Sequence, residues 1–175
     1  MDPHANIYLI GPLGAGKSSI GRKLAQMTKK RFFDTDLEIA KRSGVDLNWI
    51  CEVEGESGYR KREQAVIAEL CQEKNIVIST GGGAVLVLEN RTILKTTGTV
   101  IYLEVSFKRQ YERTQLRRNT RPVLEDGNSF KHNLKKLNDE RTALYEQTAH
   151  ASFDTNQSNT NKLSKCIIQH LQDNP

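Results

Sequence analysis

The chain has 175 residues, of which 37% are hydrophobic, and it carries a formal net charge of +5 at pH 7. A chain of this length buries roughly two-thirds of its unfolded surface as one domain, and no stretch approaches the roughly 20 apolar residues of a membrane span. The composition therefore predicts one soluble domain, residues 1–175, without a membrane partner. We expect it in the cytoplasm because the N-terminus does not resemble a signal peptide and the three cysteines suggest reduced thiols without metal-ligand spacing.

The excess of positive charge allows two kinds of anionic partner, nucleic acids and small anions. The denser basic patches lie at residues 29–31, 60–62 and 117–121, and no DNA- or RNA-binding motif accompanies them. We therefore expect no nucleic acid partner, although a nucleotide switch or an RNA-associated protein remains an alternative. No self-association stripe is evident, so we expect a monomer.

Apolar runs alternate with helical patterns along the chain. The pattern predicts five strands, at Asn6–Ile10, Arg31–Asp34, Ile76–Thr80, Thr99–Val105 and Ser152–Thr155. It predicts helices at Ser18–Thr28, Leu37–Ser43, Leu47–Val53, Gly58–Lys74, Val85–Lys95, Phe107–Leu116, Phe130–Gln147 and Asn161–Leu171. Strands that alternate with helices are typical of βαβ units, so we expect an α/β domain with a five-stranded parallel sheet.

Residues 11–18, GPLGAGKS, match the phosphate-binding pattern G-x-x-x-x-G-K-[ST] without a mismatch, between a predicted strand and a predicted helix. Backbone N–H groups of such a loop converge on phosphate oxygens at the N-terminus of the helix. Lys17 supplies a cation for the β- and γ-phosphates, and the Ser18 hydroxyl can bind Mg²⁺. The motif predicts a bound nucleoside triphosphate, contacted by Gly14, Ala15, Gly16, Lys17, Ser18 and Ser19.

Two aspartates, Asp34 and Asp36, follow the second predicted strand. Ligands of open parallel sheets collect beyond the carboxyl ends of the strands, so one carboxylate can orient the water around Mg²⁺ and the other can orient an acceptor hydroxyl. Asp36 is equally well placed to cap the helix that begins at Leu37, and spacing alone does not decide between the two roles. No apolar run ends in the catalytic aspartate of large ATPases, which argues against a motor or a helicase.

Three glycines, Gly81, Gly82 and Gly83, follow the third predicted strand. Glycines in a row cost conformational entropy, which indicates close approach of another group to the backbone. A tight turn is the alternative explanation.

Three arginines occupy unusual positions. Arg141 lies on the apolar stripe of its helix and therefore needs an anion, either a ligand or a core acid. Arg60 lies one turn before Glu63, which can hold the guanidinium so that it binds a carboxylate; a surface ion pair is the alternative. Arg121 lies in the polar segment 117–129 and can close over a phosphate, or it is a solvated loop charge.

Taken together, these motifs resemble the shikimate kinase family. The matches are GPLGAGKS at 11–18, DTD at 34–36, EGESGYRKRE at 54–63, STGGGAV at 79–85, VIYLEV at 100–105, NTRPVL at 119–124 and RTALY at 141–145. They follow the order of the family and span nearly the whole chain. The phosphate loop is shared by many enzymes, whereas the other motifs as a set are much more specific.

The resemblance implies a three-layer α/β/α P-loop kinase with sheet order 2-3-1-4-5, a substrate-binding region at about residues 35–62 and a lid at about 113–128. It implies transfer of the γ-phosphoryl of ATP to the 3-hydroxyl of shikimate, with one Mg²⁺ ion, in aromatic amino acid biosynthesis. A gluconate-type or nucleoside-monophosphate kinase on the same fold is the nearest alternative, because gluconate also carries a carboxylate.

The resemblance also implies roles for the phosphate side of the site. Lys17 would bind phosphate and stabilise the transferring group, and Ser18 and Asp34 would hold Mg²⁺. Arg121 would be the lid arginine that approaches the phosphates. The adenine would lie between Arg113 or Arg117 and the turn at residues 156–160, which includes Gln157.

On the acceptor side, Asp36 would contact the hydroxyls of shikimate and serve as the candidate base. Arg60 and Arg141 would clamp the carboxylate, helped by backbone amides around Gly82 and Gly83.

Three departures from the family pattern affect these roles. The spacing from Arg113 to Arg121 is one residue longer than usual, which leaves the adenine-stacking arginine ambiguous. Tyr59 stands where the family commonly has phenylalanine. Cys51 stands where a phenylalanine often lines the substrate pocket, so we expect weaker binding from the smaller side chain.

Overall fold

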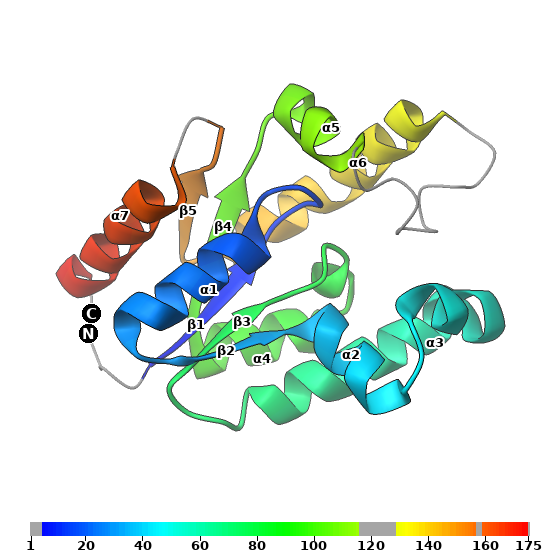
Figure 1. Cartoon of the computed structure of the whole chain (residues 1–175), viewed down its shortest axis with the longest axis horizontal. Helices are drawn as coiled ribbons and strands as arrows, with labels where there is room; N and C mark the ends of the chain where they lie inside the picture. Colours follow the sequence, from blue (N-terminus) through cyan, green and yellow to red (C-terminus); the bar gives the residue numbers. More distant parts are fainter. Residues whose placement is uncertain (1–4, 116–128, 157–158, 175) are drawn as a thin grey trace.

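The computed structural model describes residues 5–115, 129–156 and 159–174. Its five strands pair in parallel in the order β2-β3-β1-β4-β5 (Figure 1). Their bounds are Asn6–Ile10 for β1, Arg31–Asp34 for β2, Ile76–Ser79 for β3, Gly98–Glu104 for β4 and Ala151–Asp154 for β5. The predicted sheet and its order are confirmed.

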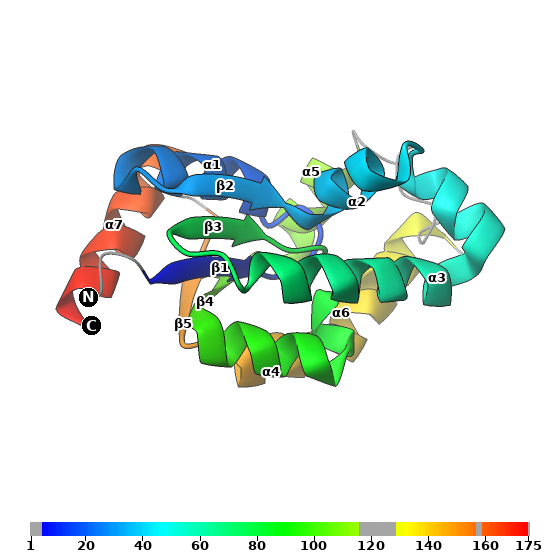
Figure 2. The ribbon, with the colours of Figure 1, turned by 90° about the horizontal axis from the view of Figure 1, so that it is seen from below.

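Helices cover both faces of the sheet, as the three-layer prediction requires (Figure 2). The helices are α1 Lys17–Thr28, α2 Thr35–Ser43, α3 Leu47–Leu70, α4 Leu88–Thr97, α5 Phe107–Gln115, α6 Phe130–Thr148 and α7 Thr160–Asp173, with a 3₁₀ turn, η1, at Ala84–Leu86. Figure 2 shows α1 and α7 on one face of the sheet and α3 and α4 on the other.

The central strand β1 supplies both halves of the core, because successive side chains of a strand point to opposite faces. Ile7 and Leu9 belong to the cluster under α1 and α7, whereas Tyr8 and Ile10 belong to the cluster under α3 and α4. All four side chains are fully buried. A strand buried on both faces reads as a continuous apolar run, which is why the sequence pattern located it.

The structure alters three of the expected helices. The segments expected at 47–53 and 58–74 follow one another as α3, with a break at Gly55, whose φ of 70° and ψ of 179° are not helical. The second segment ends at Leu70, and Asn75 takes a left-handed φ of 61° before β3. The helix expected at 85–95 is divided into η1 and α4, because Val87 between them is extended.

All five strands run in the same direction, so their carboxyl ends meet at one edge of the sheet. The phosphate loop after β1, the aspartates after β2 and the glycines after β3 therefore lie at the same edge, as the sequence predicted. No helix in the described part of the chain is both long and apolar enough to cross a membrane.

Candidate active site

The phosphate loop joins β1 to α1 and depends on left-handed glycines. Gly14 has φ 78° and Gly16 has φ 88°, a region that L side chains rarely adopt. Lys17 is buried, and its Nζ donates to the carbonyl oxygens of Gly11 at 2.7 Å and Pro12 at 2.9 Å. The lysine thus lies across its own loop, at the position that phosphate oxygens would share.

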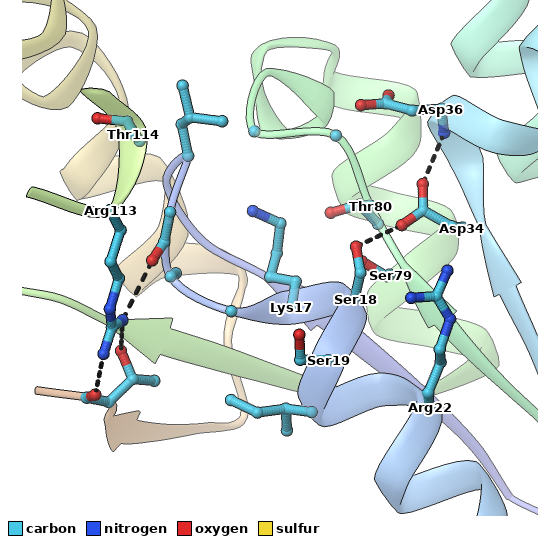
Figure 3. Close-up of a pocket in the computed structure, with 18 of the residues that line it drawn as sticks. Lys17, Ser18, Ser19, Arg22, Asp34, Asp36, Ser79, Thr80, Arg113 and Thr114 are labelled. Atoms are coloured by element: carbon cyan, nitrogen blue, oxygen red, sulfur yellow. Dashed lines mark hydrogen bonds between the residues drawn. The ribbon is translucent and has the colours of Figure 1, made fainter. Parts of the chain in front are cut away.

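A pocket of about 770 Å³ opens over this loop. Its volume suits a nucleotide-sized ligand, since ligand pockets measure roughly 300–1,000 Å³. Figure 3 shows Lys17 and Ser18 in the middle of the pocket, with Arg113 and Thr114 on one side and Asp34 and Asp36 on the other. The pocket brings together these predicted residues: Gly14, Ala15, Gly16, Lys17, Ser18, Ser19, Asp34, Asp36, Gly82 and Arg113.

Asp34 has two functions in the fold. Its Oδ2 accepts a hydrogen bond of 2.5 Å from the Ser18 hydroxyl, and its Oδ1 accepts from the backbone N–H groups of Asp36 and Leu37 at the start of α2 (Figure 3). Asp34 is therefore the N-cap of α2. The hypothesis that Asp36 caps this helix is wrong, because Asp36 already lies inside the first turn.

The oxygen atoms around Ser18 fit a hard divalent cation. The Ser18 hydroxyl lies 2.5 Å from Asp34 Oδ2 and 3.4 Å from the Ser79 hydroxyl. Among the described residues no group of three or more His, Cys, Asp or Glu side chains could hold a metal ion by themselves. This donor set suits Mg²⁺, which commonly takes one or two protein oxygens together with substrate phosphates and water.

Asp36 lines the pocket from the first turn of α2 (Figure 3). Its Oδ1 accepts a hydrogen bond of 2.6 Å from the hydroxyl of Tyr59, which comes from α3. The Tyr59 hydroxyl lies 3.4 Å from Glu63 Oε1 as well. Burial, followed by the charges of Glu63 and Asp36, raises the pKa of Tyr59 far above its usual value, so this hydroxyl remains a donor.

Arg60 and Glu63 form the ion pair expected from their spacing, at 2.6 Å between Nη1 and Oε2. The Glu63 side chain is fully buried and that of Arg60 is 16% exposed. Burial raises the pKa of Glu63, and the charge of Arg60 opposes that rise. The guanidinium is more occupied than expected, because its Nη2 also pairs with the half-exposed Glu56 at 3.2 Å.

Arg141 is buried on α6, as the apolar stripe predicted. Its Nε is buried and has no hydrogen-bond partner among the described residues, and the same holds for Nε of Arg60. One turn further on α6, the buried Tyr145 donates a 2.5 Å hydrogen bond to the carbonyl oxygen of Gly82. This hydrogen bond attaches the helix that carries Arg141 to the segment 81–83, which we call the glycine loop.

A Cβ added at each of the three glycines after β3 would meet a different side chain. A Cβ at Gly81 would overlap the Glu63 carboxylate and crowd Asp36, and a Cβ at Gly83 would overlap the Arg60 guanidinium. A Cβ at Gly82 would lie 3.8 Å from Nη1 of Arg141, which is ordinary contact. Close approach of side chains accounts for Gly81 and Gly83, and the segment also makes a tight turn in which the Ala84 N–H donates to the Gly81 carbonyl at 3.2 Å, so both explanations considered apply.

Arg113, at the end of α5, connects the phosphate loop to the end of β5. Its Nη1 donates to the Gly14 carbonyl at 3.1 Å and to the Thr155 hydroxyl at 3.2 Å, and its Nη2 donates to the Thr155 carbonyl at 2.8 Å. Arg113, Thr155 and Thr160 all line the pocket. Three predicted site residues, Arg117, Arg121 and Gln157, lie outside the described residues, as does most of the expected lid.

Cys51, which we expected in the wall of the substrate pocket, lies half-buried on α3 against the core cluster that contains Tyr59. Burial raises the pKa of its thiol, with smaller effects from the charges of Arg60, Glu56 and Asp36.

Some pocket residues were missed by sequence reasoning. Thr155 receives Arg113 at the end of β5, and Ser79 and Thr80 precede the glycines at the end of β3. Their position at the carboxyl ends of predicted strands could have indicated that they line the pocket. Arg22 also lines the pocket, and its guanidinium stacks on Phe32 with 5.3 Å to the ring centroid; a surface arginine on a helix gave no signal of this kind.

Comparison with known proteins agrees with this geometry. The family model described as shikimate kinase matches residues 13–172. The shikimate kinase of Legionella pneumophila (strain Corby) is 48% identical over 166 residues, covering 95% of this chain and 94% of that protein. The shikimate kinase of Pasteurella multocida (strain Pm70) is 48% identical over 163 residues, covering 93% of each chain.

Among solved structures, shikimate kinase from Acinetobacter baumannii in complex with shikimate superposes with a TM-score of 0.93 at 41% identity. The match covers 97% of this chain and 94% of that chain. Shikimate kinase from Aquifex aeolicus superposes with a TM-score of 0.80 at 32% identity, covering 97% of each chain.

Proposed function

The chain belongs to the shikimate kinase family of ATP-dependent phosphotransferases, and on that premise we propose that it transfers the γ-phosphoryl group of ATP to the 3-hydroxyl of shikimate. The products are shikimate 3-phosphate and ADP. The observation that carries the proposal is the convergence, at one edge of the sheet, of a complete phosphate loop and a pocket aspartate with the buried Arg141 and the mostly buried Arg60 beside the glycines that follow β3.

Phosphoryl transfer needs positioning and charge stabilisation more than covalent help from the protein. The hydroxyl oxygen of shikimate forms a bond to the γ-phosphorus while the bond from that phosphorus to the β,γ-bridging oxygen breaks. Lys17 neutralises charge on the transferring group, since its ammonium already lies over the carbonyls of Gly11 and Pro12. The backbone of Gly14, Ala15 and Gly16, with Ser19, holds the phosphates.

Asp36 orients the acceptor hydroxyl and takes its proton. The carboxylate faces the pocket from α2 and is held at Oδ1 by Tyr59, which leaves Oδ2 for the acceptor. A positioned carboxylate of this kind contributes roughly 10²–10⁴-fold to a proton transfer.

Arg60 and Arg141 bind the carboxylate of shikimate, with backbone amides of Gly82 and Gly83 beside them. Both guanidinium groups approach the glycine loop, and each carries a buried Nε without a partner in the described part of the chain. Arginine suits this task because its planar fork matches a carboxylate. Glu56, the more exposed partner of Arg60, is the group that the substrate displaces.

Ser18 and Asp34 would hold one Mg²⁺ ion, whose charge would draw electron density from the phosphate oxygens. Arg113, in its contacts with Gly14 and Thr155, lines the adenine side of the pocket. The proposal keeps Arg117 and Gln157 as further nucleotide contacts, and Arg121 as the catalytic arginine of a lid at residues 113–128.

The chain is proposed to act as one kinase domain of residues 1–175, with its acceptor region at 35–62. We further propose a cytoplasmic monomer, in keeping with the three unbridged cysteines and the lack of a self-association stripe in the sequence.

The test is ADP release by the purified protein with MgATP, measured in parallel with shikimate, with gluconate and without an acceptor. We expect turnover with shikimate alone. Turnover with gluconate instead would mean that Arg60 and Arg141 bind the carboxylate of a different acceptor. ATP turnover without any acceptor would favour a nucleotide switch.

A further inference from the structure

The hydroxyl of Tyr59 lies between two carboxylates that belong to different parts of the acceptor site. It donates to Asp36 Oδ1 at 2.6 Å and lies 3.4 Å from Glu63 Oε1. A phenol has a single hydrogen to donate, so the shorter contact with Asp36 takes it. Glu63 in turn holds Arg60 at 2.6 Å, so the tyrosine hydroxyl lies between the acceptor-orienting aspartate and the carboxylate that holds Arg60.

The ring of Tyr59 is held on several sides. Its residue is 9% exposed, and the guanidinium of Arg60 lies over the ring with 5.0 Å to the centroid. Gly81 packs so closely that a Cβ there would lie 3.1 Å from the Tyr59 hydroxyl. The hydroxyl therefore has little freedom to leave Asp36.

This contact limits the orientation of Asp36. The terminal torsion of an aspartate is broad, so its two oxygens are ordinarily free to rotate. With Oδ1 engaged by Tyr59, rotation costs a hydrogen bond to a charged acceptor, and Oδ2 is the oxygen that remains for the acceptor hydroxyl. A phenylalanine at this position would fill the same space without supplying the donor.

We propose that Tyr59 is a positioning residue for the transfer step, which holds the Asp36 carboxylate in the orientation that meets the acceptor hydroxyl. This inference rests on the proposed function, because it assigns to Asp36 the contact with that hydroxyl.

The test compares two variants that each lose one buried tyrosine hydroxyl. Tyr59→Phe removes the donor to Asp36, and Tyr8→Phe is the matched control, because the Tyr8 hydroxyl lies 3.0 Å from Thr97 Oγ1 near the opposite edge of the sheet. For each variant we would measure kcat, the KM values for shikimate and ATP, and the melting temperature.

We expect Tyr59→Phe to lower kcat roughly three- to tenfold, the effect of losing one hydrogen bond in the transition state. The KM for ATP should stay within twofold of wild type, because the tyrosine is remote from the phosphate loop contacts. Tyr8→Phe should leave kcat unchanged whatever it does to the melting temperature. An equal kcat for Tyr59→Phe and wild type would overturn the proposal.

A double-mutant cycle separates positioning of Asp36 from a general loosening of the site. In an Asp36→Asn background, single-turnover measurements should show that Tyr59→Phe has no further effect on the transfer rate. The same fold loss in both backgrounds would overturn the link to Asp36. Failure of the wild-type protein to use shikimate would instead overturn the proposed function, and the inference with it.

Discussion

Arg60 and Glu63 form an ion pair of 2.6 Å between adjacent turns of α3, in which the carboxylate is fully buried. Removal of Arg60 would leave a buried charge without its cation, which costs about 3–5 kcal/mol. We expect Arg60→Ala to lower the free energy of unfolding by that order. The double variant Arg60→Ala/Glu63→Gln should recover most of this free energy but should not recover shikimate binding. Urea denaturation measures the free energy of unfolding, and titration calorimetry measures shikimate binding.

The stability of Arg60→Ala should also depend on pH. Burial raises the pKa of Glu63 in the folded protein, so the folded state binds this proton more tightly than the unfolded state does. The contribution of Glu63 to the free energy of unfolding is therefore most favourable at acid pH. It falls as the pH rises through the ordinary carboxyl range toward the raised pKa. Denaturation at about pH 5 and pH 8 tests this, and the deficit should be larger at the higher pH. A deficit that grows toward acid pH would contradict the assignment to Glu63.

Asp36→Asn should separate nucleotide binding from transfer. The substitution keeps the shape of the side chain and removes its basicity, so we expect kcat to fall by roughly 10²–10⁴-fold. The dissociation constant of MgATP should be unchanged, because Asp34 and not Asp36 contacts Ser18 and caps α2. Near-normal turnover in this variant would exclude Asp36 as the base.

Arg141→Ala should act on the acceptor and not on the nucleotide. Loss of one charged partner of a carboxylate corresponds to about 1.5–3 kcal/mol, or roughly a 10- to 100-fold rise in the KM for shikimate. Arg141→Lys is the matched control for charge, and it should remain impaired because lysine lacks the planar fork. An unchanged KM for shikimate in Arg141→Ala would refute the clamp.

Alanine substitutions at two neighbouring glycines, Gly83 and Gly82, should differ in their effect on the melting temperature. A Cβ at Gly83 would overlap the guanidinium of Arg60, so Gly83→Ala must displace it from Glu63 and lower the melting temperature. Gly82→Ala serves as the control for folding, because its Cβ would meet ordinary contacts of 3.5–3.8 Å. Thermal denaturation of both variants checks the prediction, and equal losses would mean that backbone conformation and not Arg60 restricts the loop.

Arg113→Ala should weaken ATP binding selectively. The guanidinium lines the pocket and holds Gly14 and Thr155 on its nucleotide side, so its loss removes a wall of the pocket and releases both segments, and we expect the KM for ATP to rise roughly tenfold. The KM for shikimate should change less than twofold. A larger effect on shikimate than on ATP would move Arg113 out of the adenine site.

The sequence predicted the sheet and the edge where the site lies from local patterns, whereas the strand order was implied by the resemblance to the shikimate kinase family. Central strands buried on both faces leave apolar runs, and the phosphate loop has a fixed spacing that only this turn requires. The burial of Arg141 followed from helical phase alone, since its helix presents an apolar stripe at that position.

What the sequence could not supply depends on contacts between distant segments. The capping of α2 by Asp34 and not by Asp36 depends on where the helix starts, and boundaries are weakly encoded. The second partner of Arg60, Glu56, is a different case: it lies four residues earlier on the same helical segment, so the i,i+4 rule could have found this pair and the sequence analysis overlooked it. The hydrogen bond from Tyr59 to Asp36 joins residues 23 positions apart, beyond any helical period.

The double duty of Asp34 bears on how degenerate relatives are interpreted. Since one of its oxygens caps α2 and the other holds Ser18, selection for folding alone would preserve this aspartate in a lineage that no longer phosphorylates anything. Asp36 caps no helix, and its carboxylate is engaged only by the hydroxyl of Tyr59 among the contacts described above. A descendant that retains Asp34 but has replaced Asp36 is therefore a candidate for a pseudoenzyme. In such a comparison Asp34 indicates that the fold has been kept, and Asp36 indicates that phosphoryl transfer has been kept.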